Sequence, residues 1–273
     1  MDKNAVLDKL HQLPAMPLAV REVLSSFRDP NVGSATMAHK IEIDQGLSAR
    51  VLRVANSSFY GLSREVGSIR DAVTVLGFDT IRSLVVSAGF THAFPATADG
   101  LFDRHAYWMR SIRVATYTEA LTQCLGGMRK FSFTSGLFHD VGQLVLSVCI
   151  PEKFAEVLAQ QKASGVNLIE VEHAMLGFDH GEIGAEMVKR WNFPPQIERG
   201  IRYWRKPEHE PFEPLAGTVF VAVLLEQGLV GEDLIGRIPG KLREGLQISW
   251  ERIEPSMPQP EQLDAVAKLL LDI

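Results

Sequence analysis

The hydrophobic residues of this chain recur every three or four positions, which is the spacing of one face of an α-helix. In the segment 17–28, for example, Leu18, Val20, Val23 and Leu24 follow this spacing. No stretch of the sequence shows the two-residue alternation of hydrophobic and polar residues that marks a β-strand. The pattern therefore predicts an all-α protein.

Capping and turn-forming residues divide the first 90 residues into short helices. Pro14 and Pro17 interrupt the helical pattern, because a proline disfavours the helical conformation of the residue before it. The expected helices span residues 5–13, 17–28, 34–43, 46–56, 69–76 and 79–86. The side chains expected to cap them are those of Ser34, Asp44, Ser68 and Asp79. Because most polar residues of this part stand at helix ends, we expect a compact bundle without catalytic residues.

The rest of the chain is predicted to form longer helices, after a joint at Thr97-Ala98-Asp99-Gly100. The expected helices span residues 102–125, 131–150, 151–163, 168–176, 181–191, 194–204, 215–228, 239–245 and 261–271. We accordingly divide the chain into an N-terminal helical bundle (1–95), a helical subdomain (100–230) and a C-terminal helical extension (231–273).

One polar pair, His139-Asp140, stands inside the apolar stretch 136–143, on the helix expected at 131–150. Adjacent residues of a helix point about 100° apart, so both side chains reach one centre only if that centre lies against the helix flank. A divalent metal bound by imidazole nitrogen and carboxylate oxygen is one such centre. The alternative is a buried pair that hydrogen-bonds neighbouring helices, and the octapeptide by itself favours this alternative.

The composition is that of an ordinary globular protein. Of the 273 residues, 46% are hydrophobic and 22% charged, and the net charge is −5 without a polybasic run. Nucleic acids and anionic membranes attract clustered lysine and arginine, so neither is an expected partner. The longest apolar run, 144–150 with one serine, is too short to span a bilayer, and the N-terminus leads into no apolar signal-peptide core. With Cys124 and Cys149 in apolar settings, we expect reduced cysteines in a cytoplasmic protein without membrane insertion.

Several stretches of the sequence together resemble a known family. They are LPAMP at 13–17, IDQGLSARVLRVANS at 43–57, SIRDAVTVLG at 68–77, GLFHDVGQLVL at 136–146 and DHGEIGA at 179–185, with Trp191. They resemble the HDOD domain, a catalytically silent branch of the HD-domain superfamily in bacterial signalling proteins. The resemblance covers about residues 10–230 and implies an N-terminal helical bundle packed on an HD-like helical core.

The resemblance also implies which residues of a metal site are kept. Active HD phosphohydrolases combine a first histidine, the His-Asp pair, often further histidines, and a late aspartate, and their metal activates a bound water. Ungapped matching keeps His139, Asp140 and His180 but places Arg110 at the first histidine and Val223 at the late aspartate. Arg110 is repulsive to a metal ion and is able to pair with Asp140 instead. We therefore expect no bound metal and no cofactor, with His139, Asp140 and His180 as remnants of the site.

The resemblance favours a non-enzymatic regulatory module of bacterial signal transduction that acts through protein–protein interaction. HDOD domains are often attached to receiver, cyclic-dinucleotide or kinase domains, which this sequence lacks. The expected partners are therefore signalling proteins met in trans: a kinase, a response regulator or a cyclic-dinucleotide protein.

The alternative function is a metal-dependent HD-type phosphohydrolase of nucleotides or cyclic dinucleotides. In it, His139, Asp140 and His180 hold the ion. A further carboxylate completes the shell, for which the candidates are Asp71, Asp179 and Glu182.

Three segments are weak candidates for partner binding, one of which is the aromatic and cationic segment 58–64 between two helices. Tyr203, Trp204 and Arg205 combine aromatic and cationic side chains, a mixture enriched at interaction sites, and Tyr203-Trp204 also match a place where relatives often carry two adjacent histidines. The alternative is that Trp204 only covers the helix below it. The last helix, 261–271, has an apolar face that packs either on the core of its own chain or on a second copy, and its own core is the expected place.

Overall fold

The computed structural model describes residues 3–26, 34–57, 59–95, 102–127 and 129–271. Within these ranges the chain is built from α-helices and short 3-10 turns and contains no strand, so the predicted all-α class is confirmed. No helix in the same ranges has the length and hydropathy needed to cross a membrane. The predicted joint at 97–100 and the side chain of Ser34 lie outside the described part.

The N-terminal bundle consists of short helices close to those predicted. They are α1 (Lys3–Asp8), the 3-10 turn η1 (Lys9–Gln12), α2 (Leu18–Ser26), α3 (Ser34–Glu42), α4 (Gln45–Ala55), α5 (Ile69–Leu76) and α6 (Phe78–Ala93). Asp44 and Ser68 cap α4 and α5 as expected, each accepting a backbone N–H three residues on at 3.0 Å. The prediction for Asp79 is wrong: it lies inside the first turn of α6 and accepts from Arg82 Nη1 at 2.9 Å. Gly77, with φ of 87°, separates α5 from α6.

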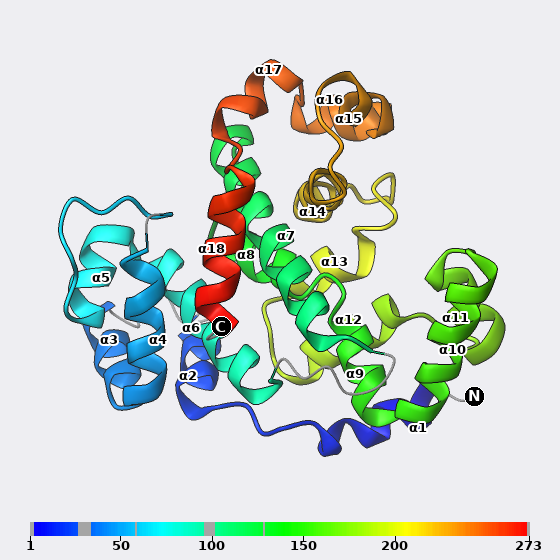
Figure 1. Ribbon diagram of the computed structural model, residues 1–273, viewed down its shortest axis with the longest axis horizontal. Helices are drawn as coiled ribbons and strands as arrows, with labels where there is room; N and C mark the ends of the chain where they lie inside the picture. The colour runs from blue at the N-terminus through cyan, green and yellow to red at the C-terminus, as the bar shows by residue number, and fades with distance from the viewer. Residues whose placement is uncertain (1–2, 27–33, 58, 96–101, 128, 272–273) are drawn as a thin grey trace.

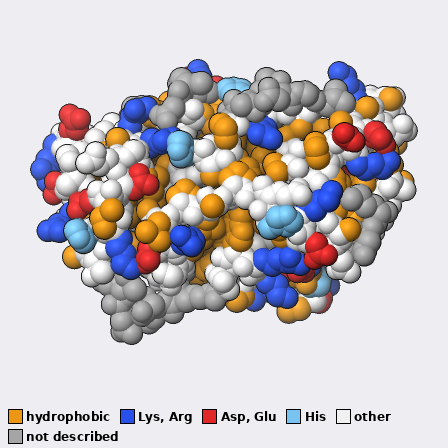
Figure 2. All heavy atoms as spheres, turned by 90° about the horizontal axis from the view of Figure 1, so that it is seen from below, with side chains coloured by type: hydrophobic (Ala, Val, Ile, Leu, Met, Phe, Trp, Pro, Cys, Tyr) orange, Lys and Arg blue, Asp and Glu red, His pale blue; other side chains and the backbone are white. Residues whose placement is uncertain are grey.

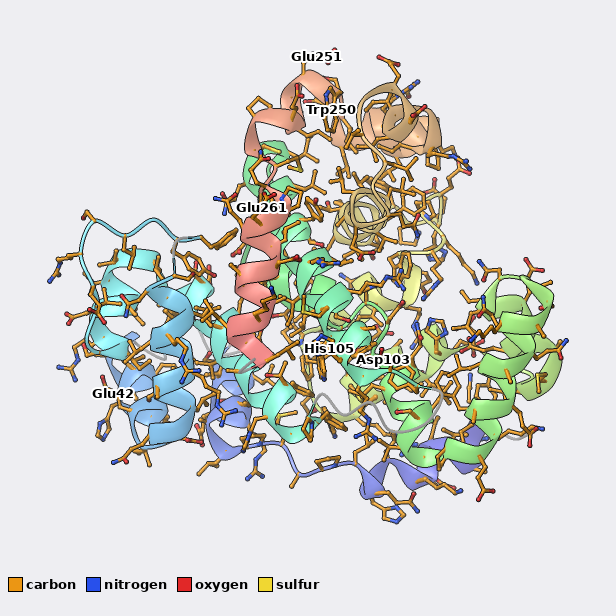
Figure 3. The ribbon with its side chains drawn as sticks, viewed as in Figure 1. Glu42, Asp103, His105, Trp250, Glu251 and Glu261 are labelled. Atoms are coloured by element: carbon orange, nitrogen blue, oxygen red, sulfur yellow. The ribbon has the colours of Figure 1, made fainter. Side chains whose placement is uncertain are left out.

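The middle of the chain begins with the longest helix, α7. Its elements are α7 (Arg104–Leu125), α8 (Arg129–Leu137), α9 (Val141–Cys149), α10 (Pro151–Ser164), α11 (Leu168–Leu176), α12 (His180–Arg190), α13 (Pro195–Tyr203) and α14 (Pro214–Glu226). Asp103 starts α7 by accepting the backbone N–H of Ala106 at 2.9 Å (Figure 3).

The C-terminal part is more regular than the sequence pattern predicted. It contains α15 (Gly231–Arg237), α16 (Gly240–Leu246), α17 (Trp250–Ile253), the 3-10 turn η2 (Glu254–Ser256) and α18 (Pro260–Leu271). Neither α15 nor α17 was predicted, whereas α16, which is as short as α15, was expected at 239–245.

Helix α7 runs through the middle of the molecule, with α8, α14 and α18 packed along it (Figure 1). The helices α2 to α6 lie to one side of it, and α10 to α12 lie to the other. Leu263, Val266 and Leu270 of α18 are buried, and this helix packs on α7, α4 and α6. The prediction that the last helix covers the core of its own chain is therefore confirmed.

Aromatic rings join the N-terminal bundle to the rest of the core. Phe90 of α6 packs edge-on against Phe138 with ring centroids 4.5 Å apart, and Phe138 packs against Phe193 at 5.3 Å. All three rings belong to one hydrophobic cluster that also includes the buried residues of α2 to α5. One core thus includes residues from both sides of the joint predicted at 97–100. Phe138, the residue before His139, packs on rings from both sides of that joint.

Candidate functional site

His139 and Asp140 lie in a turn between α8 and α9, not in the middle of one helix. The prediction of a single helix over 131–150 is therefore wrong. Tight turn hydrogen bonds run from His139 N to Gly136 O at 3.4 Å and from Val141 N to Phe138 O at 3.0 Å. Because the chain changes direction here, the two side chains are free of the 100° separation imposed by a helix and reach the same centre.

Two glycines explain why the helix breaks at this point. A Cβ atom on Gly136 would lie 2.6 Å from Ala115 Cα of α7, and one on Gly142 would lie 1.7 Å from the carbonyl oxygen of His180. Each glycine therefore allows a backbone-to-backbone approach, α8 against α7 and α9 against α12. The two close crossings thus hold α8 and α9 against different helices on either side of the turn.

His180 joins the pair from the first turn of α12 and is oriented by Glu172 of α11. The buried Glu172 carboxylate accepts from His180 Nδ1 at 2.6 Å and from its backbone N–H at 3.0 Å. The ring therefore turns Nε2 toward Asp140, whose Oδ1 lies 3.5 Å away. Glu172 was not predicted as a site residue, because a glutamate eight residues before a histidine is no recognised motif. Its position next to apolar Val171 was the one sign that this carboxylate could be buried.

Arg205 occupies the centre of the site. Its Nη2 contacts both Asp140 Oδ1 and His180 Nε2. The guanidinium also lies over the ring of Trp204, with Cζ 4.0 Å from the ring centroid. A guanidinium nitrogen only donates hydrogen bonds, so Nε2 of His180 accepts here and its proton is on Nδ1. An internal cation thus joins the carboxylate to the second histidine.

The other carboxylate oxygen of Asp140 is held as well. Oδ2 accepts from Gln143 Nε2 at 3.0 Å and from Arg110 Nη1 at 3.4 Å, which forms the ion pair expected for Arg110. Burial by itself disfavours the charged carboxylate, but Arg205, His139 and His180 outweigh it and hold the pKa of Asp140 well below its usual range. Asp140 is therefore a buried, permanently charged group at neutral pH.

His139 has one bonded and one unbonded ring nitrogen. Nδ1 donates to Gly136 O at 2.7 Å, whereas Nε2 has no hydrogen-bond partner within the described residues and lies 3.5 Å from Asp140 Oδ2. Burial lowers the pKa of His139 to about 4. Trp204 covers the pair, since its indole N–H donates to His139 O at 2.9 Å. His139 is thus a neutral imidazole with an available lone pair.

A second line of ion pairs leads away from Asp140. Arg110 Nε lies 3.3 Å from Glu226 of α14, and Arg113 lies between Glu226 at 3.8 Å and Asp264 of α18 at 2.6 Å. Burial raises the pKa of Glu226, although Arg110 and Arg113 favour its charged form. Charges of opposite sign therefore alternate from the site across α7 and α14 to the last helix.

The ligand set does not fit a divalent ion in this arrangement. The free lone pair of His139 Nε2 could bind a metal ion. However, Arg205 lies between the other two candidate ligands, Asp140 Oδ1 and His180 Nε2, and Arg110 pairs with Asp140 Oδ2. Val223, matched to the late aspartate, is buried in the hydrophobic cluster of α14 to α17. The carboxylate that α14 does supply, Glu226, binds arginine.

The other predicted residues lie in several places. Tyr203 stacks on His209 with centroids 3.7 Å apart, and Trp204 is buried, so Trp204 covers the site below it. Asp71 lies on α5 of the N-terminal bundle. Asp179 caps α12 and pairs with exposed His173 at 3.1 Å, and Glu182 pairs with Lys3 at 2.8 Å. The structure thus brings His139, Asp140, His180, Arg110 and Arg205 together under Trp204, and it leaves Asp71, Asp179, Glu182, Val223 and Tyr203 outside this group.

Comparison with known proteins gives a consistent picture. The model of the HDOD domain family matches residues 13–207. A crystal structure from Shewanella amazonensis SB2B, of a protein provisionally named a phosphohydrolase, is 29% identical with a TM-score of 0.81, covering 97% of this chain and 98% of that one. An HDOD domain protein with unknown function from Geobacter sulfurreducens is 24% identical with a TM-score of 0.72, covering 98% and 92%.

A sequence relative is longer than this chain. An uncharacterized protein of Treponema pallidum (strain Nichols) is 25% identical over 252 residues, which are 91% of this chain and 48% of the relative. The chain therefore spans about half the length of the curated relative that it matches.

Proposed function

The chain belongs to the HDOD domain family, and from this premise we propose that it is a non-enzymatic regulatory module of signal transduction that works by binding other proteins. Its partners on this proposal are signalling proteins met in trans: a kinase, a response regulator or a cyclic-dinucleotide protein. The proposed location is the cytoplasm, and nucleic acid is not a proposed partner because the chain carries a net charge of −5 without a polybasic run.

The observation that carries this proposal is the position of Arg205. Its guanidinium contacts Asp140 and His180, two of the three candidate metal ligands. A divalent ion about 4 Å from a guanidinium is repelled by on the order of 8 kcal/mol at an effective dielectric constant of about 20. Arg110, on the other carboxylate oxygen, adds to this repulsion. With the cation supplied by the chain itself, the site serves to hold helices together.

The alternative function, a metal-dependent phosphohydrolase, has two observations in its favour. The Shewanella protein that is 29% identical to this chain carries a provisional phosphohydrolase name, and His139 Nε2 offers a free lone pair. For this function Arg205 has to leave the site before an ion enters. Another residue also has to supply the carboxylate ligand that is missing at Val223.

Metal content separates the two functions. We expect protein purified without a histidine tag, and dialysed against Mn²⁺, Fe²⁺ or Zn²⁺ and then buffer, to retain no ion by mass spectrometry. We expect no hydrolysis of nucleotides or cyclic dinucleotides by the same samples. About one ion per chain, lost in His139→Ala, together with hydrolysis of a nucleotide or a cyclic dinucleotide would overturn the proposal in favour of the phosphohydrolase.

A further inference from the structure

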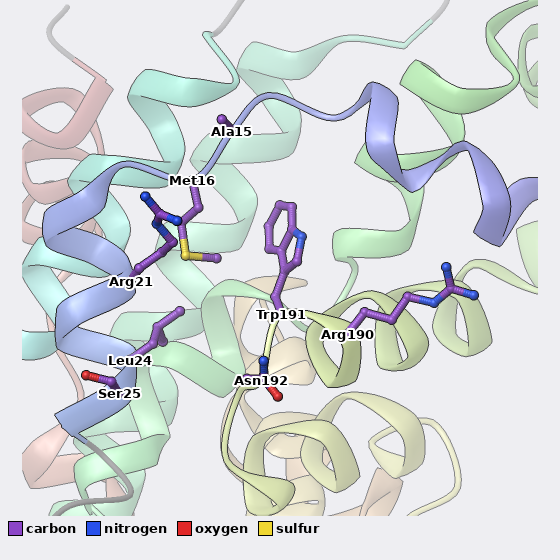
Figure 4. Close-up of a pocket in the computed structure, with 8 residues that line it drawn as sticks. All are labelled: Ala15, Met16, Arg21, Leu24, Ser25, Arg190, Trp191 and Asn192. Atoms are coloured by element: carbon purple, nitrogen blue, oxygen red, sulfur yellow. The ribbon is translucent and has the colours of Figure 1, made fainter.

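An open groove lies where the segment before α2 crosses the end of α12 (Figure 4). Its volume is about 710 Å³. The residues that line it are Ala15, Met16, Arg21, Leu24, Ser25, Arg190, Trp191 and Asn192. It is separate from the His139–Asp140 site, with which it shares no residue. On the face of the molecule that carries the segment before α2, hydrophobic side chains gather across the middle with lysine and arginine side chains among them (Figure 2).

The floor of the groove is apolar and firmly supported. Met16 and Trp191 are half-buried, and Leu24 is buried. The indole of Trp191 packs against Phe90 of the aromatic core with ring centroids 5.3 Å apart. Trp191 therefore presents a fixed ring to the groove, and rigid aromatic side chains of this kind are the usual anchors of protein interfaces.

The rim of the groove is cationic. Arg21 and Arg190 are both exposed, and neither forms an ion pair with a carboxylate in the described part of the chain. Arg190 Nη1 donates to the backbone carbonyl of Leu7 at 2.7 Å, which fixes its side chain without neutralising its charge. In Figure 4 the two guanidinium groups lie on either side of Trp191. The rim of the groove is therefore positively charged although the chain as a whole carries a net charge of −5.

We propose that this groove binds an acidic peptide segment of a partner protein. An apolar side chain of the segment packs on Trp191, Met16 and Leu24, and flanking carboxylates bind Arg21 and Arg190. Arginine pairs well with carboxylates because its planar fork of donors matches them. This inference rests on the proposed function, because it names the chemistry of the partner that a non-enzymatic module would recognise.

A phosphate ligand fits the groove less well than carboxylates do. Phosphate sites commonly use free backbone N–H groups at the start of a helix. None of the lining residues belongs to the first three positions of a helix, and Arg190 is the last residue of α12, where the helix dipole disfavours a concentrated anion. Ser25 and Asn192 are the lining residues with uncharged polar side chains, which is few for reading a nucleotide base.

The test uses the whole protein and a phage library of random dodecapeptides. We expect selection on the wild type, with counter-selection on Arg21→Glu/Arg190→Glu, to enrich peptides that combine Asp or Glu with large apolar residues. By fluorescence anisotropy, each single charge reversal should weaken a selected peptide at least about tenfold. Binding should also weaken between about 0.05 and 0.5 M salt, because salt screens exposed charges.

The matched control is Arg243→Glu, which makes the same charge change at an exposed position of α16, away from the groove. It should leave peptide affinity unchanged, and circular dichroism should show all variants folded. The proposal is overturned if no groove-dependent peptide is selected, if Arg243→Glu weakens binding as much as the groove variants, or if a cyclic dinucleotide binds in the groove and is lost on Arg21→Glu. These outcomes leave the metal and hydrolysis results of the proposed function untouched, so the two failures are distinguishable.

Discussion

Single side chains decide whether this site holds an ion, and Arg205 is the most informative of them. In Arg205→Ala the buried carboxylate of Asp140 loses its main partner, and removing one member of a buried ion pair costs about 3 to 5 kcal/mol. The same change frees Asp140 Oδ1 and His180 Nε2 beside the unbonded His139 Nε2. We expect the variant to unfold at lower temperature than the wild type and to regain part of the loss with Zn²⁺ in a thermal-shift measurement.

Two controls accompany this prediction. The wild type should show no Zn²⁺-dependent shift, and Arg205→Ala/His139→Ala should lose the shift seen in the single variant. Equal stabilisation of all three proteins by Zn²⁺ would mean that the ion binds elsewhere. The group of exposed His173 and half-buried Asp179 and Glu182, whose potential ligand atoms lie within 4.8 Å of one another, is where we would then look.

His139 makes stability depend on pH above the range in which carboxylates titrate. Its pKa falls from the usual 6.5 to about 4 on folding because the ring is buried. The unfolded chain therefore binds this proton first, and the stability due to the neutral ring is present above pH 6.5 and lost toward pH 4. The low pKa of Asp140 acts in the same direction but only below the usual carboxyl range.

Urea unfolding at pH 7 and pH 4.5 tests this contribution. We expect the wild type to lose about 2.5 kcal/mol more than His139→Asn between these values. The asparagine amide is able to donate to Gly136 O as Nδ1 does, but it does not titrate. His180, whose pKa is raised by Asp140 and Glu172 despite burial and Arg205, contributes in the opposite direction in both proteins and cancels in the difference. Equal losses in the two proteins would contradict the prediction.

At the scale of helices, close crossings set the geometry of the site. Adding a methyl group at Gly142 places it 1.7 Å from the carbonyl oxygen of His180, so α9 and α12 must separate. We expect Gly142→Ala to lower the free energy of unfolding by about 3 kcal/mol or more, as overpacking and a displaced backbone both cost stability. Chemical denaturation measures the change directly.

Gly236→Ala is the matched control for this crossing. Gly236 lies in α15, and an added Cβ there meets no atom within 4 Å. We expect it to be neutral or to stabilise by about 0.5 to 1 kcal/mol, because alanine is the better helix former. A Gly142→Ala variant as stable as Gly236→Ala would show that the crossing of α9 and α12 adjusts at no cost.

The helices that sequence patterns predicted best are those whose ends are set locally. Asp44 and Ser68 cap as expected, and Gly77 stops α5, because a cap or a positive φ acts within a few residues. The break at His139-Asp140 was missed because its cause is tertiary: Gly136 and Gly142 meet α7 and α12, which are distant in sequence. The same holds for the site. His139, Asp140 and His180 could be identified as site residues from the sequence. Glu172 and Arg205 could not, because only the folded structure brings them next to these residues.

For the molecule as a whole, a continuous series of polar contacts and ion pairs runs from α11 to α18. Glu172 holds His180, His180 contacts Arg205, and Asp140 pairs with Arg205 and Arg110. Arg110 and Arg113 of α7 then pair with Glu226 of α14, and Arg113 pairs with Asp264 of α18. Phe138, next to His139, ties the same turn into the aromatic core of the N-terminal bundle. One turn of chain is therefore anchored by charged groups on one side and by aromatic packing on the other.

The position of α18 also affects the order in which the N-terminal bundle is completed during synthesis of the chain. The hydroxyl of Thr91 on α6 donates to the carbonyl oxygen of Leu270 at 3.0 Å, across 179 positions of the chain. At a synthesis rate of about 5 to 20 residues per second, those positions take roughly 9 to 36 s to make. During that interval a growing chain lacks the helix that covers the apolar faces of α4 and α6 in the folded protein. The packing of the N-terminal bundle is therefore completed only when α18, made much later, folds against it.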